Sequence, residues 1–155
     1  MKMRRKALSV LLAICLIAAM MPTLAFAEET AADDIVILYT GDMHGGVSDN
    51  ISLAGVAAYA KEKKAQTSYV EIVDAGDALS GTAIANASKG KYAADAMNAA
   101  GYAVAVPGVH DFDFGVDRLV DELASAANYQ YVSANFAYSA GTTTVFKPYK
   151  LVTYG

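Results

Sequence analysis

The pattern of apolar and polar residues along this chain predicts strands that alternate with helices. Short, continuous apolar runs rich in β-branched residues are typical of strands, and residues 35–39 have the pattern of a strand covered on both faces. The predicted strands are residues 35–39, 69–73, 102–106, 129–133, 142–146 and 149–154. Helical spacing of apolar residues predicts helices at 51–64, 91–100 and 116–127. This alternation indicates an α/β fold with a largely parallel or mixed sheet.

The first 27 residues differ in pattern from the rest of the chain. Four of the first six residues are basic, and an uncharged apolar stretch, residues 7–25, follows and ends in the small-x-small triplet 25–27. This pattern predicts a secretory signal peptide that is cleaved after Ala27. A retained membrane anchor is the less favoured alternative, because acidic residues follow the apolar stretch where an anchor would have basic ones.

We therefore divide the chain into a signal peptide, residues 1–27, an acidic leader, residues 28–34, and one folded part, residues 35–155. The expected product is secreted, and is extracellular, in the cell wall or periplasmic. It has no membrane span after cleavage.

Charge and cysteine content narrow the chemistry of the mature chain. Removing residues 1–27 removes four of the 12 basic residues and none of the 16 acidic ones, so the net charge changes from −4 to −8. This acidic balance disfavours a nucleic-acid backbone as partner, because such binding needs a basic surface. Cys15, the single cysteine, is lost with the signal peptide, which excludes thiol catalysis, thiolate metal sites and disulfides.

Three acidic motifs follow predicted strands and carry the candidate chemistry. Asp42 and His44 follow the first strand, Asp77 follows the second, and His110 and Asp113 follow the third. Taken singly, each has an ordinary explanation: a turn for Asp42, a helix N-cap for Asp77 and a structural role for His110.

The spacing of these motifs favours a shared site. Asp77 lies 35 residues after Asp42, and His110 lies 33 residues after Asp77, about one strand-helix unit each time. Sites in open α/β sheets form beyond the carboxyl ends of the strands, where all three motifs are expected to lie. On an extended segment, Asp42 and His44 would point to the same side. Carboxylates and imidazoles that converge in this way bind divalent metal ions.

Six stretches of the chain resemble a known family: residues 37–45, 73–82, 95–102, 108–115, 133–135 and 147–149. They are similar to the amino-terminal part of the secreted 5′-nucleotidase and 2′,3′-cyclic-nucleotide phosphodiesterase family, which are calcineurin-like metallophosphoesterases. The resemblance implies the amino-terminal half of a four-layer α/β/β/α sandwich. It also implies an exported hydrolase that removes phosphate from nucleotides or other small phosphoesters.

The resemblance further implies two divalent metal ions, such as Mn, Zn, Fe or Co, that activate water together. Asp42 and His44 would bind the first ion, and Asp77 would bridge both. His110 would be catalytic, with Asp113 as its partner. The substrate-binding residues are not implied by the motifs.

The chain departs from the family pattern at Val109, where the family has an asparagine that binds the second ion. Asp111 stands where the family usually has glutamate, and the family's later histidine ligands would lie beyond Gly155. We therefore expect at most one weakly bound ion. The alternative to the hydrolase is a non-catalytic, truncated remnant that acts as a weak metal-binding or surface interaction module. Missing later strands would leave a sheet edge uncovered and favour self-association.

Other catalytic classes lack support in the sequence. Residues 76–82 lack the lysine of a phosphate-binding P-loop, and no G-x-G-x-x-G follows the first strand. No serine lies in a nucleophile-elbow motif.

Overall fold

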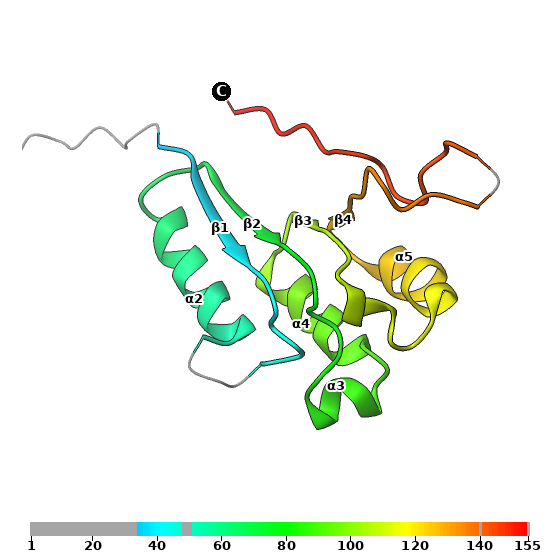
Figure 1. Ribbon diagram of the computed structural model, residues 1–155. Coiled ribbons are helices and arrows are strands. Elements are labelled where there is room, and N and C mark those ends of the chain that lie inside the picture. Colours follow the sequence, from blue (N-terminus) through cyan, green and yellow to red (C-terminus); the bar gives the residue numbers. More distant parts are fainter. Residues whose placement is uncertain (1–33, 48–50, 140, 155) are drawn as a thin grey trace, which may run out of the picture. The chain divides into compact units, whose positions relative to one another are not determined.

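The computed structural model describes residues 34–47, 51–139 and 141–154, and these residues form alternating strands and helices (Figure 1). The strands are β1 (Val36–Thr40), β2 (Val70–Asp74), β3 (Val104–Ala105) and β4 (Gln130–Tyr131). The helices are α2 (Leu53–Lys64), α3 (Ala83–Ala87), α4 (Lys91–Ala100), the 3-10 helix η1 (Val109–Phe112), the π-helix η2 (Arg118–Leu123) and α5 (Ala124–Ala126). The predicted signal peptide, 1–27, and residues 28–33 of the leader lie outside the described residues.

The four strands form one sheet in the order β1-β2-β3-β4. Every pair of neighbours is parallel, and the register of the first pair sets Val36 opposite Val70 and Thr40 opposite Asp74. Antiparallel pairing in the described residues is limited to one isolated bridge, between Ala137 and Thr144. Parallel order brings the carboxyl ends of β1, β2 and β3 to the same edge of the sheet, which is where the three motifs begin.

Helices cover one face of this sheet, and the described residues leave the other face of β1 open. Leu38 packs against the buried core, whereas its neighbours Ile37 and Tyr39 are 60% and 81% exposed. The prediction that this strand is covered on both faces is therefore wrong for the described part of the chain. One helical layer on one sheet is the α/β half of the predicted four-layer fold.

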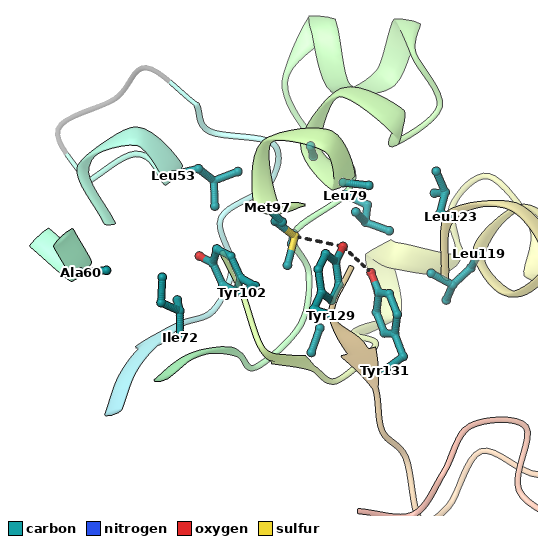
Figure 2. Close-up of a cluster of buried hydrophobic side chains, with 14 residues drawn as sticks. Leu53, Ala60, Ile72, Leu79, Met97, Tyr102, Leu119, Leu123, Tyr129 and Tyr131 are labelled. Carbon is teal, nitrogen blue, oxygen red and sulfur yellow. Dashed lines mark hydrogen bonds between the residues drawn. The ribbon is translucent and has the colours of Figure 1, made fainter. Parts of the chain in front are cut away.

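The core lies between the sheet and the helices (Figure 2). Its largest fully buried side chains come from strands, helices and the loop after β2: Leu53, Ile72, Leu79, Met97 and Leu119. Within it, the Tyr129 hydroxyl lies 3.5 Å from Met97 Sδ and 3.4 Å from the Tyr131 hydroxyl. The buried tyrosines thus keep polar partners inside an apolar cluster.

The two longest helices end where they were predicted to end, and α2 begins at Leu53, two residues after its predicted start. Ser52 caps α2 by accepting a hydrogen bond from the Gly55 amide at 3.1 Å. Helix α4 spans the predicted residues 91–100, and Gly101 ends it in the left-handed conformation, with φ of 82°.

Two strand predictions for the second half of the chain are corrected, and one helix prediction is refined. The predicted strand 142–146 contributes only the bridge of Thr144, and the predicted strand 149–154 is absent from the described residues. Leu151 is 83% exposed, and residues 149–154 make isolated contacts in place of a strand ladder, such as that of the Tyr154 ring with the Tyr69 ring. The predicted helix 116–127 is present over residues 116–126, but its middle part, Arg118–Leu123, is a π-helix. In the described ranges, no helix is long and apolar enough to cross a membrane.

Candidate metal centre

The candidate site begins in two loops that run side by side after β1 and β2. The Asp42 amide donates to the Gly76 carbonyl, and the His44 amide donates to the Asp77 carbonyl, both at 2.9 Å. Asp42, His44 and Asp77 have positive φ values of 54°, 48° and 58°. The expected extended segment is therefore wrong, because left-handed turns, which cost L-residues energy, aim these side chains.

Asp42, His44 and Asp77 lie together in the structure. Each offers one possible ligand atom, and these atoms lie within 4.8 Å of one another. Asp42 is exposed, and the other two are partly buried, so the cluster is open to solvent on one side. Two carboxylates and one imidazole at such separations are a donor set that suits a divalent cation.

The orientation of His44 is fixed by a backbone carbonyl. His44 Nδ1 lies 3.1 Å from the Ser80 carbonyl oxygen. A carbonyl only accepts, so Nδ1 carries the proton. Nε2 is then left with its lone pair, and it lies 4.0 Å from Asp42 Oδ1. His44 thus presents a ligand atom toward the neighbouring carboxylate.

The loop of the third motif, which contains His110, holds the Asp77 side chain in place. Its Oδ1 accepts a hydrogen bond from the His110 amide at 2.7 Å. Gly108 packs directly against Asp77, and a Cβ at position 108 would overlap the Asp77 carboxylate. This close approach explains why glycine precedes the third motif.

His110 and Asp113 form the predicted pair, with 3.2 Å between Nδ1 and Oδ2. The Ser80 hydroxyl donates to the same Asp113 oxygen at 2.7 Å. This hydroxyl, together with His110, lowers the pKa of Asp113 and outweighs desolvation, which acts in the opposite direction. The His110 ring lies edge-on to the His44 ring, with 5.3 Å between centroids. The structure therefore places the pair directly beside the Asp42, His44 and Asp77 cluster.

Asp111 has a role that the motif alone did not predict. Its side chain is buried, and its two oxygens accept hydrogen bonds from four backbone amides at 2.8–3.0 Å, those of Asp77, Ala78, Leu79 and Gly108. Burial raises the pKa of Asp111, and these four hydrogen bonds oppose the rise. Two sets of hydrogen bonds thus join the loop of Asp77 to the loop of His110. Asp111 accepts from the first loop, and the Asp77 side chain accepts from the His110 amide.

Asp74 is a second buried carboxylate that sequence reasoning missed. Its oxygens accept from the Thr40 hydroxyl at 2.7 Å and from the Gly76 amide at 3.0 Å, and Thr40 lies 2.9 Å from the Tyr102 hydroxyl. Burial raises the pKa of Asp74 to about 6. The alternation of residues along β2 could have predicted this burial, because Asp74 lies on the same face of the strand as buried Val70 and Ile72.

Val109 stands where the resemblance implies an asparagine ligand in the family. It is the first residue of η1 and is 73% exposed. Its side chain offers no lone pair to a cation.

Comparison with curated proteins finds 5′-nucleotidases and a cyclic-nucleotide phosphodiesterase among the relatives, although no family model matches the chain. The chain is 31% identical over 141 residues to a 5′-nucleotidase of Bos taurus and 31% identical over 139 residues to a snake venom 5′-nucleotidase of Gloydius brevicauda. It is also 28% identical over 159 residues to a 2′,3′-cyclic-nucleotide 2′-phosphodiesterase/3′-nucleotidase of Yersinia enterocolitica. These matches cover 79%, 79% and 91% of the chain but only 24% of each relative.

Solved structures share the fold. The Haemophilus influenzae NAD nucleotidase matches with a TM-score of 0.64 and 23% identity, over 77% of this chain and 24% of that one. The calcineurin-like phosphoesterase YfkN of Bacillus subtilis matches with a TM-score of 0.61 and 23% identity, over 73% of this chain and 40% of that one. The motifs, the fold and the sequence similarity together make this chain a relative of the amino-terminal part of the 5′-nucleotidase and 2′,3′-cyclic-nucleotide phosphodiesterase family of calcineurin-like phosphoesterases.

Proposed function

We propose that this chain is part of an exported, metal-dependent phosphoester hydrolase of the 5′-nucleotidase type, which removes phosphate from nucleotides. The observation that carries the proposal is the convergence of Asp42, His44 and Asp77 beside the His110 and Asp113 pair. The chain spans about a quarter of the length of its curated relatives, so the activity of the whole protein is part of the proposal.

Asp42, His44 and Asp77 would hold the first divalent ion. The donor set fits, because two carboxylates and an imidazole with a free Nε2 suit Mn, Zn, Fe or Co. Such an ion would supply Lewis-acid charge that activates water and offsets the negative charge of a phosphoryl group. Val109 gives no side-chain ligand to a second ion, so we expect one ion, weakly bound, in this chain.

His110 and Asp113 would handle the proton and the developing charge. An ionised Asp113 accepts from His110 Nδ1, which leaves Nε2 to face the reacting groups. When water displaces the leaving alkoxide from phosphorus, a protonated His110 can donate its Nε2 proton to that oxygen or stabilise charge on the phosphoryl oxygens. The His110 side chain is 50% exposed, so a substrate can reach it from solvent.

The substrate class follows from charge and from the relatives. A net charge of −8 for residues 28–155 disfavours polymeric nucleic acid, whereas small nucleotides or other phosphoesters need only local positive charge from a bound ion. The amino-terminal pattern supports export to the periplasm, cell wall or medium. Mass measurement of the exported product should then find Glu28 as its first residue.

The direct test is manganese-dependent release of phosphate from AMP by the full chain. Asp77→Asn should abolish any such turnover, while Asp121→Asn, a change at an exposed carboxylate of η2, should leave it unchanged. Turnover that is equal in wild type and Asp77→Asn would overturn the proposed site.

Val109 supports a second candidate, a non-catalytic metal-binding or surface module. This alternative predicts manganese binding without phosphate release. Val109→Asn would restore an amide oxygen at an exposed position, and we expect it to tighten manganese binding about tenfold if the site is a degraded metal centre. Val116→Asn, at another exposed valine, is the control. Phosphate release that appears only in Val109→Asn would favour a hydrolase lineage with a lost ligand.

A further inference from the structure

Ser80 lies in the loop after β2 and contacts both histidines of the candidate site, one directly and one through Asp113. It is 2% exposed, and its carbonyl and hydroxyl point to different partners. We infer that Ser80 is a positioning residue that orients both imidazoles, holding His44 through its carbonyl and His110 through Asp113. The catalytic consequence of this orientation rests on the proposed function; the orientation itself does not.

The carbonyl contact acts on the candidate metal ligand. The 3.1 Å contact from His44 Nδ1 requires a proton on Nδ1, as a carbonyl oxygen has none to give. The ring is thereby restricted to the tautomer whose Nε2 carries the lone pair. Hydrogen bonds of this kind to the second ring nitrogen commonly orient metal-binding histidines.

The hydroxyl contact acts on the other histidine. Ser80 Oγ and His110 Nδ1 both reach the same oxygen, Asp113 Oδ2, at 2.7 and 3.2 Å. Asp113 is on the exposed side of the site and would rotate freely without a fixed donor. The buried hydroxyl anchors one carboxylate oxygen, and the anchored oxygen then fixes the His110 ring.

A single buried residue therefore couples the two rings, whose centroids lie 5.3 Å apart. Removing the hydroxyl should release His110 and leave His44 in place, because the His44 contact uses the backbone. This difference allows one substitution to test both halves of the inference.

The test uses imidazole nitrogen NMR of the full chain, which contains only two histidines. In the wild type, we expect both rings to show the Nδ1–H tautomer when neutral. In Ser80→Ala, His44 should keep this pattern, whereas His110 should become a mixture of both tautomers. Ser80→Thr, which retains a hydroxyl, should restore the His110 pattern.

Two further variants keep the test decisive. Asp113→Asn should change His110 and spare His44, even if the threonine variant does not fold. Ser133→Ala removes another buried hydroxyl, which contacts Asn135 and Phe136, and should change neither ring. An unchanged His110 in Ser80→Ala, or equal changes in both rings, would overturn the inference. The NMR measurement needs no metal or substrate. If the proposed hydrolase function is wrong, the phosphate-release assay will show it, and the NMR result on Ser80 will still stand.

Discussion

Asp111 shows how one buried residue can hold the candidate site together. Each of its oxygens accepts two backbone amides: Oδ2 those of Asp77 and Gly108, and Oδ1 those of Ala78 and Leu79. Buried charged acceptors of this kind stabilise strongly only while every donor keeps its partner. The loop that carries Asp77 therefore depends on a residue from the His110 loop.

Asp111→Asn should destabilise the protein. Whichever way the new amide turns, its NH₂ group faces two backbone N–H donors, which lose their acceptor. We expect a loss of about 2–3 kcal/mol in the free energy of unfolding, measured by urea denaturation. Asp95→Asn breaks only an exposed ion pair with Lys91 and should cost about 0.5 kcal/mol or less. Equal costs for the two variants would contradict the role given to Asp111.

The raised pKa of the buried Asp74 carboxyl predicts how the stability of the fold depends on pH. Burial raises the pKa of Asp74 from 3.8 to about 6, so the folded state holds this proton more tightly than the unfolded state. Its contribution to stability is complete below about pH 4 and is lost as the pH rises to about 6. The whole change is about 3 kcal/mol.

Asp74→Asn should remove this part of the pH dependence. Its carbonyl can accept from the Gly76 amide while its NH₂ donates to Thr40, which can donate in turn to Tyr102, so the network can be kept. Urea midpoints measured between pH 4 and 7 should favour the variant increasingly as the pH rises. Parallel curves for variant and wild type would show that Asp74 does not titrate as proposed.

At the scale of elements, the end of α4 offers a clean test of helix capping. Gly101 has φ of 82°, and a Cβ built there would meet nothing within 4 Å. Gly101→Ala should therefore cost only the left-handed backbone, about 1 kcal/mol in the free energy of unfolding. Thermal or urea unfolding measures this cost. A neutral or stabilising result would mean that the helix ends differently in solution.

Helices with strong local signals could be predicted from the sequence, and strands at the periphery could not. Helix α4 matched residue for residue because Gly101 marks its end. The strands predicted at 142–146 and 149–154 did not form, because apolar alternation yields a strand only where a neighbour supplies hydrogen bonds. Helices α3 and η1 were missed, since both are too short to show periodicity.

The candidate site could be predicted in its members but not in its geometry. Position after successive parallel strands was sufficient to group Asp42, Asp77 and His110. The left-handed backbone of Asp42 and His44, and the contacts of Ser80 and Asp111, arise from packing between loops distant in sequence. Such contacts leave no local pattern.

At the scale of the whole molecule, the open face beside β1 is an exposed apolar surface that the described residues do not cover. Ile37, Tyr39, Ile51 and Tyr59 are exposed and, with neighbours on β1 and α2, line an open apolar cavity of about 420 Å³. The sequence predicted an uncovered edge where later strands would pair, whereas this apolar surface lies beside the first strand, β1. Apolar surface beside an edge strand favours association of copies, and self-association remains a prediction.

Ile37→Lys should reduce that association. Ile37 lies opposite Glu71 in the register of β1 and β2, so a lysine there gains a charged neighbour and keeps the strand. Sedimentation velocity should show a smaller fraction of oligomer for the variant than for the wild type. Val116→Lys places the same charge at an exposed valine away from this face and should leave the oligomer fraction unchanged. If both variants behave like the wild type, this face is not where copies meet.

The central claim is that Asp42, His44 and Asp77 bind a divalent ion, and calorimetric titration of the full chain with zinc or manganese tests it most directly. We predict one binding site per chain, and Asp77→Asn should weaken binding at least about tenfold, because it exchanges a charged ligand for a neutral one. Asp121→Asn should bind like the wild type. No saturable binding to the wild-type chain, or binding that Asp77→Asn leaves intact, would contradict the account.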